Sequence, residues 1–280
     1  MTEYDALYVE ARRVLLDALD ALAQHREAVI VAGAQAVYLH TGDAGLSVAP
    51  YTTDGDVALN PAVLGQLPEL SRTMTDAGFV HASRGEPGVW IASAEVRGEH
   101  VGIPVDLIVP ETVASPAGRR SARLAGHDKR AARKVPGLEA ALIDNAWTTI
   151  GSLSSQDRRV LESRVAGPTA LLIAKAHKIN DRLQEGVRPD RLNNKDALDV
   201  YRLMQTTPID TVRAVLPELL RDKRSEPATT AGLALVTTLF GGRNSRGVQM
   251  AVQSLDRSVP QARVEAICGG FVAQLEETGR

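Results

Sequence analysis

The alternation of apolar and polar residues predicts helices and strands in turn along the first part of the chain. Residues 5–27 carry leucine, valine and alanine at helical spacing, which predicts an amphipathic helix. The short apolar run 29–32 is typical of a buried strand, and Gly33 follows it. The next expected elements are a helix over 34–40, a loop over 42–53 and a strand over 56–59.

A second group of elements follows Asn60. Pro61 suits the first turn of a helix, which is expected to run to Ala77 and to end at Gly78. Further strands are expected over 79–83, 89–94, 101–109 and 147–153.

Beyond Gly167-Pro168 the pattern becomes almost purely helical. Helices are expected over 169–185, 194–204, 208–222, 228–240, 245–256 and 260–277. The sequence therefore predicts an α/β (α+β) domain over residues 1–166 and a helical domain over 167–280.

Composition narrows the functional class only slightly. The 280 residues are 44% hydrophobic and 24% charged, which is typical of a globular protein. There is no apolar run long enough to span a membrane, and the N-terminus lacks a secretory pattern. Cys268 is the single cysteine, so no internal disulfide is expected. These features favour a cytoplasmic protein without a membrane partner.

Charge is distributed unevenly, although the net charge is only −2. The stretch from Arg119 to Lys134 contains seven arginines and lysines against one acid, Asp128. Such a block can attract phosphate backbones. A solvated helical face or a surface loop is an equally good interpretation of the same residues.

Three aspartates are the strongest chemical signal. Asp54 and Asp56 are two apart, so in an extended chain both carboxylates project from one face. Mg²⁺ relieves the repulsion between them, because it takes oxygen ligands. Asp106 lies in the apolar run 101–109, where a carboxylate is costly unless it is paired or bound to a metal. Alternatively, Asp106 caps a loop or pairs with an arginine.

A strand, a glycine turn, a helix and an Asp-x-Asp strand together suit nucleotidyl transfer from an NTP. Carboxylate-bound Mg²⁺ ions can hold the attacking and leaving oxygens. Asp54 and Asp56 would bind the metal and triphosphate, and Asp106 would complete the site and help to deprotonate the acceptor. Gly33 would let the backbone approach phosphate oxygens, with helix amides from Ala34 onward facing the anion.

The predicted helical domain carries a second set of charges. Lys175 and Lys178 are one helical turn apart, and so are Asp196 and Asp199. Lys175 could bind the triphosphate, with Lys178 beside it and Asp196 orienting it. An ordinary salt bridge between helices explains the same residues.

These motifs occur in the order found in one family. Gly33-Ala34, Thr53-Asp54-Gly55-Asp56, Val105-Asp106-Leu107, Leu171 to Lys175 and Lys195 to Val200 resemble the nucleotidyltransferase-like toxins of type IV abortive-infection systems. The mycobacterial toxins that modify tRNA belong to this family. The similarity covers residues 25–205, and the C-terminal helices are less diagnostic.

The resemblance implies a polymerase-β-like nucleotidyltransferase core with a mixed sheet, followed by an all-helical domain. It also implies Mg²⁺, an NTP, an acceptor such as the 3′ end of tRNA, and a cognate antitoxin protein. The metal ligands would be Asp54 and Asp56, with Asp106 as the third acid. Lys175 matches the nucleotide-binding lysine of the family, and Asp196 matches the acid that follows it. The full set of candidate nucleotide contacts in this sequence is Gly33, Ala34, Thr53, Lys175 and Lys178.

One position departs from the family pattern. The broader nucleotidyltransferase signature has Gly-Ser where this chain has Gly33-Ala34, and the lost hydroxyl contact is worth about 1 kcal/mol. Ala34 is the reason to consider a degenerate scaffold, and two alternatives to tRNA modification stay open. The nucleotide could go to a protein or a small molecule, or the chain could be a binding protein on a catalytically degenerate scaffold. An unrelated α/β enzyme with a structural acidic pair is a further alternative.

Overall fold

The computed structural model describes residues 4–46, 49–83, 85–114, 120–184, 194–256 and 258–277, so Arg119 of the basic block lies outside it. The chain divides into two compact units. The sheet unit comprises Met1–Ala36, Pro50–Val135 and Asn145–Ala166. The helical unit comprises Val37–Ala49, Pro136–Asp144 and Gly167–Arg280. Residues 37–49 and 136–144 thus join the C-terminal helices rather than the sheet.

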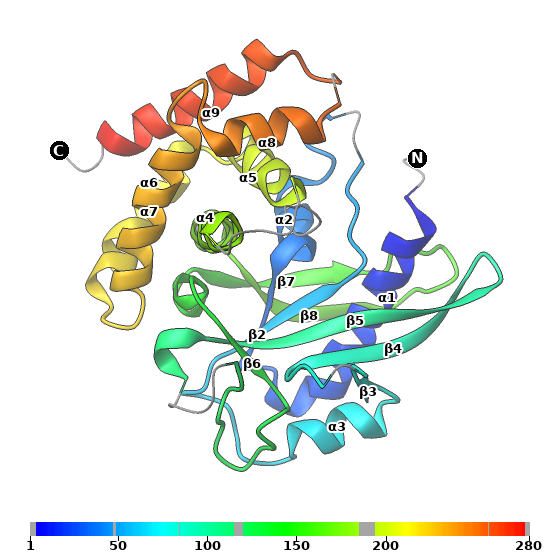
Figure 1. Cartoon of the computed structure of the whole chain (residues 1–280). Coiled ribbons are helices and arrows are strands. Elements are labelled where there is room, and N and C mark those ends of the chain that lie inside the picture. The colour runs from blue at the N-terminus through cyan, green and yellow to red at the C-terminus, as the bar shows by residue number, and fades with distance from the viewer. Residues whose placement is uncertain are drawn as a thin grey trace. The chain divides into compact units, whose positions relative to one another are not determined.

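A mixed sheet forms the frame of the sheet unit (Figure 1). Its strands are β1 (Val29–Ala32), β2 (Gly55–Leu59), β3 (Val80–His81), β4 (Val89–Val96), β5 (Glu99–Pro110), β6 (Arg133–Val135), β7 (Asn145–Gly151) and β8 (Val160–Ala166). Their order is β3-β4-β5-β2-β1-β8-β7, and β6 pairs with the end of β5. Because β1 runs antiparallel to β2 whereas β2 runs parallel to β5, the predicted α/β class with a mixed sheet is confirmed.

Helix α1 (Ala6–Ala21) covers the sheet with an apolar face. Asp5 caps its first turn by accepting from the amide of Leu7, and a short 3₁₀ helix, Leu22–His25, ends it. Val14, Leu15 and other residues of one face are buried against strands β2, β4, β5 and β8. The amphipathic helix expected from the sequence is therefore confirmed, with a 3₁₀ end.

One prediction in the sheet unit is wrong, and one strand was missed. The helix expected from Pro61 is only α3 (Leu70–Asp76), which starts after Pro68 and is capped by the Glu69 carboxylate. Proline has no amide hydrogen and clashes with a preceding helical turn, so Pro68 delays the helix. Strand β8 was not expected, because Glu162, Ser163 and Arg164 interrupt its apolar pattern.

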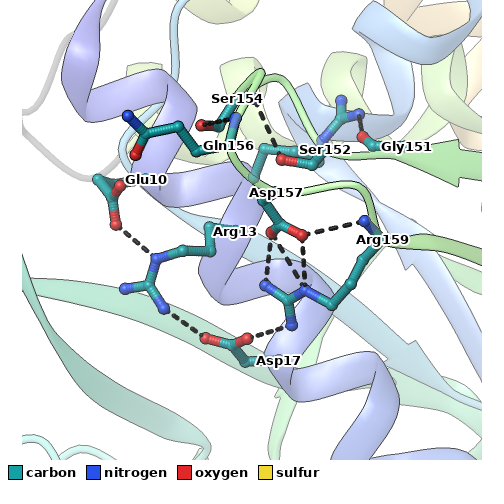
Figure 2. A network of polar contacts seen from close by, with 10 residues as sticks. Glu10, Arg13, Asp17, Gly151, Ser152, Ser154, Gln156, Asp157 and Arg159 are labelled. Carbon is teal, nitrogen blue, oxygen red and sulfur yellow. Dashed lines mark hydrogen bonds and ion pairs between the residues drawn. The ribbon is translucent and has the colours of Figure 1, made fainter.

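A charged network fixes the turn between β7 and β8 onto α1 (Figure 2). Asp17 accepts from Arg13 at 2.8 Å and from Arg159 at 2.6 Å, and Arg159 also pairs with Asp157 at 2.7 Å. Arg13 completes the network with Glu10 at 2.6 Å. Hydrogen bonds to Arg159 lower the pKa of Asp157 to about 2. The network includes none of the predicted site residues.

The helical unit contains the predicted C-terminal helices. They are α4 (Pro168–Gln184), α5 (Lys195–Thr206), α6 (Ile209–Arg221), α7 (Glu226–Phe240), α8 (Arg246–Ser254) and α9 (Gln261–Glu276). Helix α4 packs against α5, α6 and α7, and α5 packs against α8 and α9. A 3₁₀ helix, Glu139–Leu142, also contacts α4. In the described ranges, none of the helices has the length and apolar character needed to cross a membrane.

Candidate active site

Two of the three predicted acids lie side by side on paired strands of the sheet unit. Strand β2 runs parallel to β5, and the register places Asp56 directly beside Asp106. Paired residues of neighbouring strands project from the same face of a sheet, so both carboxylates lie on one side. Asp54 comes immediately before β2. The strand register thus brings Asp56 and Asp106 together, and Asp54 lies two residues before Asp56 in the chain.

Gly33, at the start of α2 (Gly33–Thr41), lies in direct contact with the Asp56 carboxylate. A β-carbon built on Gly33 would fall 1.9 Å from Oδ2 of Asp56, and φ of Gly33 is +63°. Only glycine meets both demands without strain. The space beside Gly33 is therefore taken by Asp56, whereas the sequence suggested an approach of phosphate oxygens there.

A chain of polar contacts positions Asp54. The Thr52 hydroxyl donates to the Asp54 carboxylate, and the Gln35 amide donates to the Asp54 carbonyl at 3.4 Å. Gln35 in turn accepts from Nε of Arg12 at 2.8 Å. Arg12 is buried and donates also to the carbonyl of Gly151 at 3.2 Å. Asp54 is thus tied through α2 to α1 and β7.

Asp106 forms an ion pair with Arg133, the first residue of β6. Burial raises the pKa of Asp106 to about 6, while Arg133 acts in the opposite direction. The nearby charges of Asp56 and Asp54 add to this rise. Burial alone would lower the pKa of Arg133, but the charge and hydrogen bond of Asp106, together with the charges of Asp56 and Glu86, raise it above its usual value. Asp106 therefore has a protein cation as its partner.

The acidic group fits a divalent ion only in part. Carboxylate oxygens are the ligands that Mg²⁺ prefers, and Asp54 and Asp56 supply two carboxylates from one short segment. Within the described part of the chain, no three acidic, histidine or cysteine side chains converge closely enough to hold a metal ion. Asp106 is the acid turned elsewhere, toward Arg133. Its predicted role as a metal ligand stays a prediction.

The predicted residues of the helical unit form a buried ionic cluster of their own. Nζ of Lys175 is 2.7 Å from Oδ1 of Asp196 and 2.7 Å from Oδ2 of Asp199. Asp196 also pairs with Arg182 and, at 3.4 Å, with Lys178. Lys175 is only 4% exposed, whereas the Lys178 side chain is 41% exposed. The pairing of Lys175 with Asp196 suggested by the sequence is thus present.

The charges of this cluster stabilise one another. Burial alone would raise the pKa of Asp196, but the charges of Lys175, Lys178 and Arg182 bring it well below its usual range. Burial alone would lower the pKa of Lys175, yet the two carboxylates raise it well above its usual value. Lys175 and Asp196 are therefore both charged at neutral pH.

The two predicted nucleotide contacts still to be placed are Ala34 and Thr53. Ala34 is buried in the first turn of α2, and Thr53 is half-buried beside Asp54. Sequence reasoning missed Arg12 and Gln35, and it treated Arg133 only as part of a basic block. Arg12 could have been recognised from the sequence, because it lies beside Ala11 on the apolar face of a helix. A buried arginine needs polar partners, and Gln35 is one of them.

Comparison of the chain with protein-family models, with curated proteins and with solved structures found no match. One fold can host many unrelated functions. Function is therefore inferred from the side chains of the site and from their surroundings.

Proposed function

We propose that the protein is a Mg²⁺-dependent nucleotidyltransferase that transfers a nucleotide from an NTP to the 3′ end of tRNA. We further propose that it acts as the toxin of a toxin–antitoxin pair, restrained by a cognate antitoxin protein. The observation that carries the enzymatic part is the register that places Asp56 beside Asp106 on one face of β2 and β5, with Asp54 immediately before β2. Close contact with Gly33 adds to it.

The chemistry divides among named groups of the sheet unit. When bound, Mg²⁺ supplies positive charge to phosphate oxygens, and Asp54 and Asp56 would hold it. The acceptor hydroxyl attacks the α-phosphorus, the bond to the β-phosphate breaks, and pyrophosphate leaves. Asp106 is suited to take the hydroxyl proton, because a base works best when its pKa lies near the working pH. The resemblance also implies nucleotide contacts at Lys175 and Lys178, which belong to the helical unit.

A nucleic-acid acceptor is supported by the basic block. Arg120, Arg123, Lys129 and Arg130 are exposed, and the same segment continues into Arg133 beside Asp106. Exposed cations next to an acidic catalytic group can neutralise the backbone of an RNA while its end reaches the site. A protein or small-molecule acceptor needs no such surface, so we place it second.

Labelled nucleotide incorporation tests this proposal. The purified protein is incubated with total tRNA, Mg²⁺ and each of four α-³²P-labelled NTPs. We expect label on tRNA with the wild type and none with Asp56→Asn, because Asn has lost the negative charge that binds the ion. Asp76→Asn, which changes an exposed acid on α3, is the matched control and should retain activity. Equal labelling by the wild type and Asp56→Asn would refute the proposed chemistry.

A catalytically degenerate binding protein is the second candidate function. It is favoured by Ala34, which cannot provide the usual serine hydroxyl, and by Arg133, which forms an ion pair with Asp106. Titration calorimetry with Mg²⁺ and an NTP separates the two cases. Binding without label on tRNA, protein or small molecules supports the degenerate scaffold, whereas label on any acceptor excludes it.

A further inference from the structure

Arg133 lies in the acidic group as a fixed part of the sheet. Strand β6 runs parallel to the end of β5, with Arg133 opposite Ile108. The backbone on both sides of Arg133 is also held: Ala131 accepts from Nε1 of Trp90 at 3.0 Å, and Lys134 donates to Arg120 at 2.8 Å. The guanidinium is therefore presented by hydrogen-bonded backbone rather than by a free loop.

Gly88 makes this placement of β6 possible. It accepts from the amide of Leu107 on β5 at 2.8 Å and donates to the carbonyl of Arg130 at 2.8 Å. A β-carbon on Gly88 would fall 2.5 Å from the backbone nitrogen of Arg133 and 2.5 Å from the carbonyl of Leu107. The φ of Gly88 is +74°, which a side chain rarely adopts. Glycine thus lets β5 and β6 approach closely enough to pair Asp106 with Arg133.

The positive charge of Arg133 interacts with several acidic side chains. Its guanidinium pairs directly with Asp106, whose side chain is only 15% exposed. The charges of Asp56 and Glu86 also act on Arg133. A second divalent ion at Asp106 would have to displace an arginine from its carboxylate and would then be repelled by it.

We propose that Arg133 is the built-in cation of this site, holding Asp106 in place of a second divalent ion, so that the site binds one ion through Asp54 and Asp56. This inference rests on the proposed nucleotidyltransferase function. Arg133 acts as a positioning residue: it fixes Asp106 and keeps metal away from it. The usual two-ion arrangement thus becomes one ion plus one arginine.

Counting bound Mn²⁺ by electron paramagnetic resonance tests the inference without turnover. Mn²⁺ alone is titrated into each variant, and circular dichroism checks the fold. We expect one Mn²⁺ per chain for the wild type and none for Asp56→Asn. Arg133→Met should gain a second ion and bind the first about tenfold more tightly, since a repelling charge is lost. Arg133→Met with Asp106→Asn should return to one ion.

Further variants keep the test decisive. Arg133→Lys retains the charge and should behave as the wild type, and Arg130→Met removes an exposed charge nearby and should leave the count at one. If Arg133→Met does not fold, Asp106→Asn alone decides, because it should leave the Mn²⁺ count unchanged.

Each contrary outcome has its own meaning. Two ions in the wild type, or a count that falls in Asp106→Asn, would overturn the role of Arg133 and leave the proposed function intact. A folded Arg133→Met that still binds one ion would do the same. No ion in the wild type would overturn the metal site of the proposed function, and this inference with it.

Discussion

The Asp56 carboxylate lies against the α-carbon of Gly33, so that a β-carbon on Gly33 would come within 1.9 Å of Oδ2. The contact joins the start of α2 to β2. It explains why the helix starts with a glycine, because the residue must admit a carboxylate and adopt a positive φ.

Replacing Gly33 by alanine should therefore displace Asp56. We expect Gly33→Ala to lower the free energy of unfolding by more than about 2 kcal/mol, because a clash adds to the cost of about 1 kcal/mol for the positive φ. Mn²⁺ binding should weaken as well. Urea unfolding and Mn²⁺ titration check both effects.

Gly78 provides the matched control for this variant. Its φ is +87°, but a β-carbon there would meet nothing within 4 Å. Gly78→Ala should show the backbone cost alone and leave Mn²⁺ binding unchanged. If the two variants were equally destabilised, the Asp56 contact would not be the reason for the glycine at position 33.

Local patterns made part of this structure predictable. The Asp-x-Asp spacing and the apolar flanks of Asp106 indicated that the three acids belong together, and the helical periodicity after Gly167 indicated α4 to α9. Long-range contacts were less accessible. The pairing of Arg133 with Asp106 depends on β6 joining β5. A three-residue strand inside a basic block is too short to show the alternation of apolar and polar residues that predicts a strand. Arg12 and Gln35 meet only after α1 and α2 have packed.

Lys175 should contribute to stability far more than Lys178. Lys175→Met leaves Asp196 and Asp199 without their shared buried cation, and removing one partner of a buried pair costs about 3–5 kcal/mol. Lys178→Met removes a half-exposed partner at 3.4 Å and should cost about 1 kcal/mol or less. Chemical denaturation measures both. Similar costs for the two variants would show that Lys175 is not the centre of the cluster.

The same cluster predicts a pH dependence. Burial alone would raise the pKa of Asp196, but Lys175, Lys178 and Arg182 lower it. The ion pairs of Asp196 therefore add to the free energy of unfolding above the pKa of an unfolded aspartate, which is about 3.9. That contribution is lost as the pH falls through the lower folded value. The stability gap between the wild type and Asp196→Asn should thus be constant from pH 5 to 8 and narrow below pH 4. Denaturation at each pH checks this, and a gap that widens in acid would contradict it.

The basic block should affect RNA binding through its exposed members. Arg130 and Lys129 are exposed, whereas Arg133 is committed to Asp106, so the double variant Lys129→Glu with Arg130→Glu isolates the surface. We expect weaker tRNA binding and a logarithmic salt slope shallower by about 1 for each lost phosphate contact. Filter binding at several salt concentrations measures the slope.

A matched pair of exposed cations in the helical unit, Arg221→Glu with Lys223→Glu, controls for the change in net charge. If the affinity and the slope change equally in both double variants, the effect is one of overall charge. Net charge acts at long range and is screened by salt, whereas a phosphate contact releases a bound counterion and changes the slope locally. A change confined to the Lys129 and Arg130 variant would therefore locate the RNA on the segment that ends at Arg133, beside the proposed base Asp106.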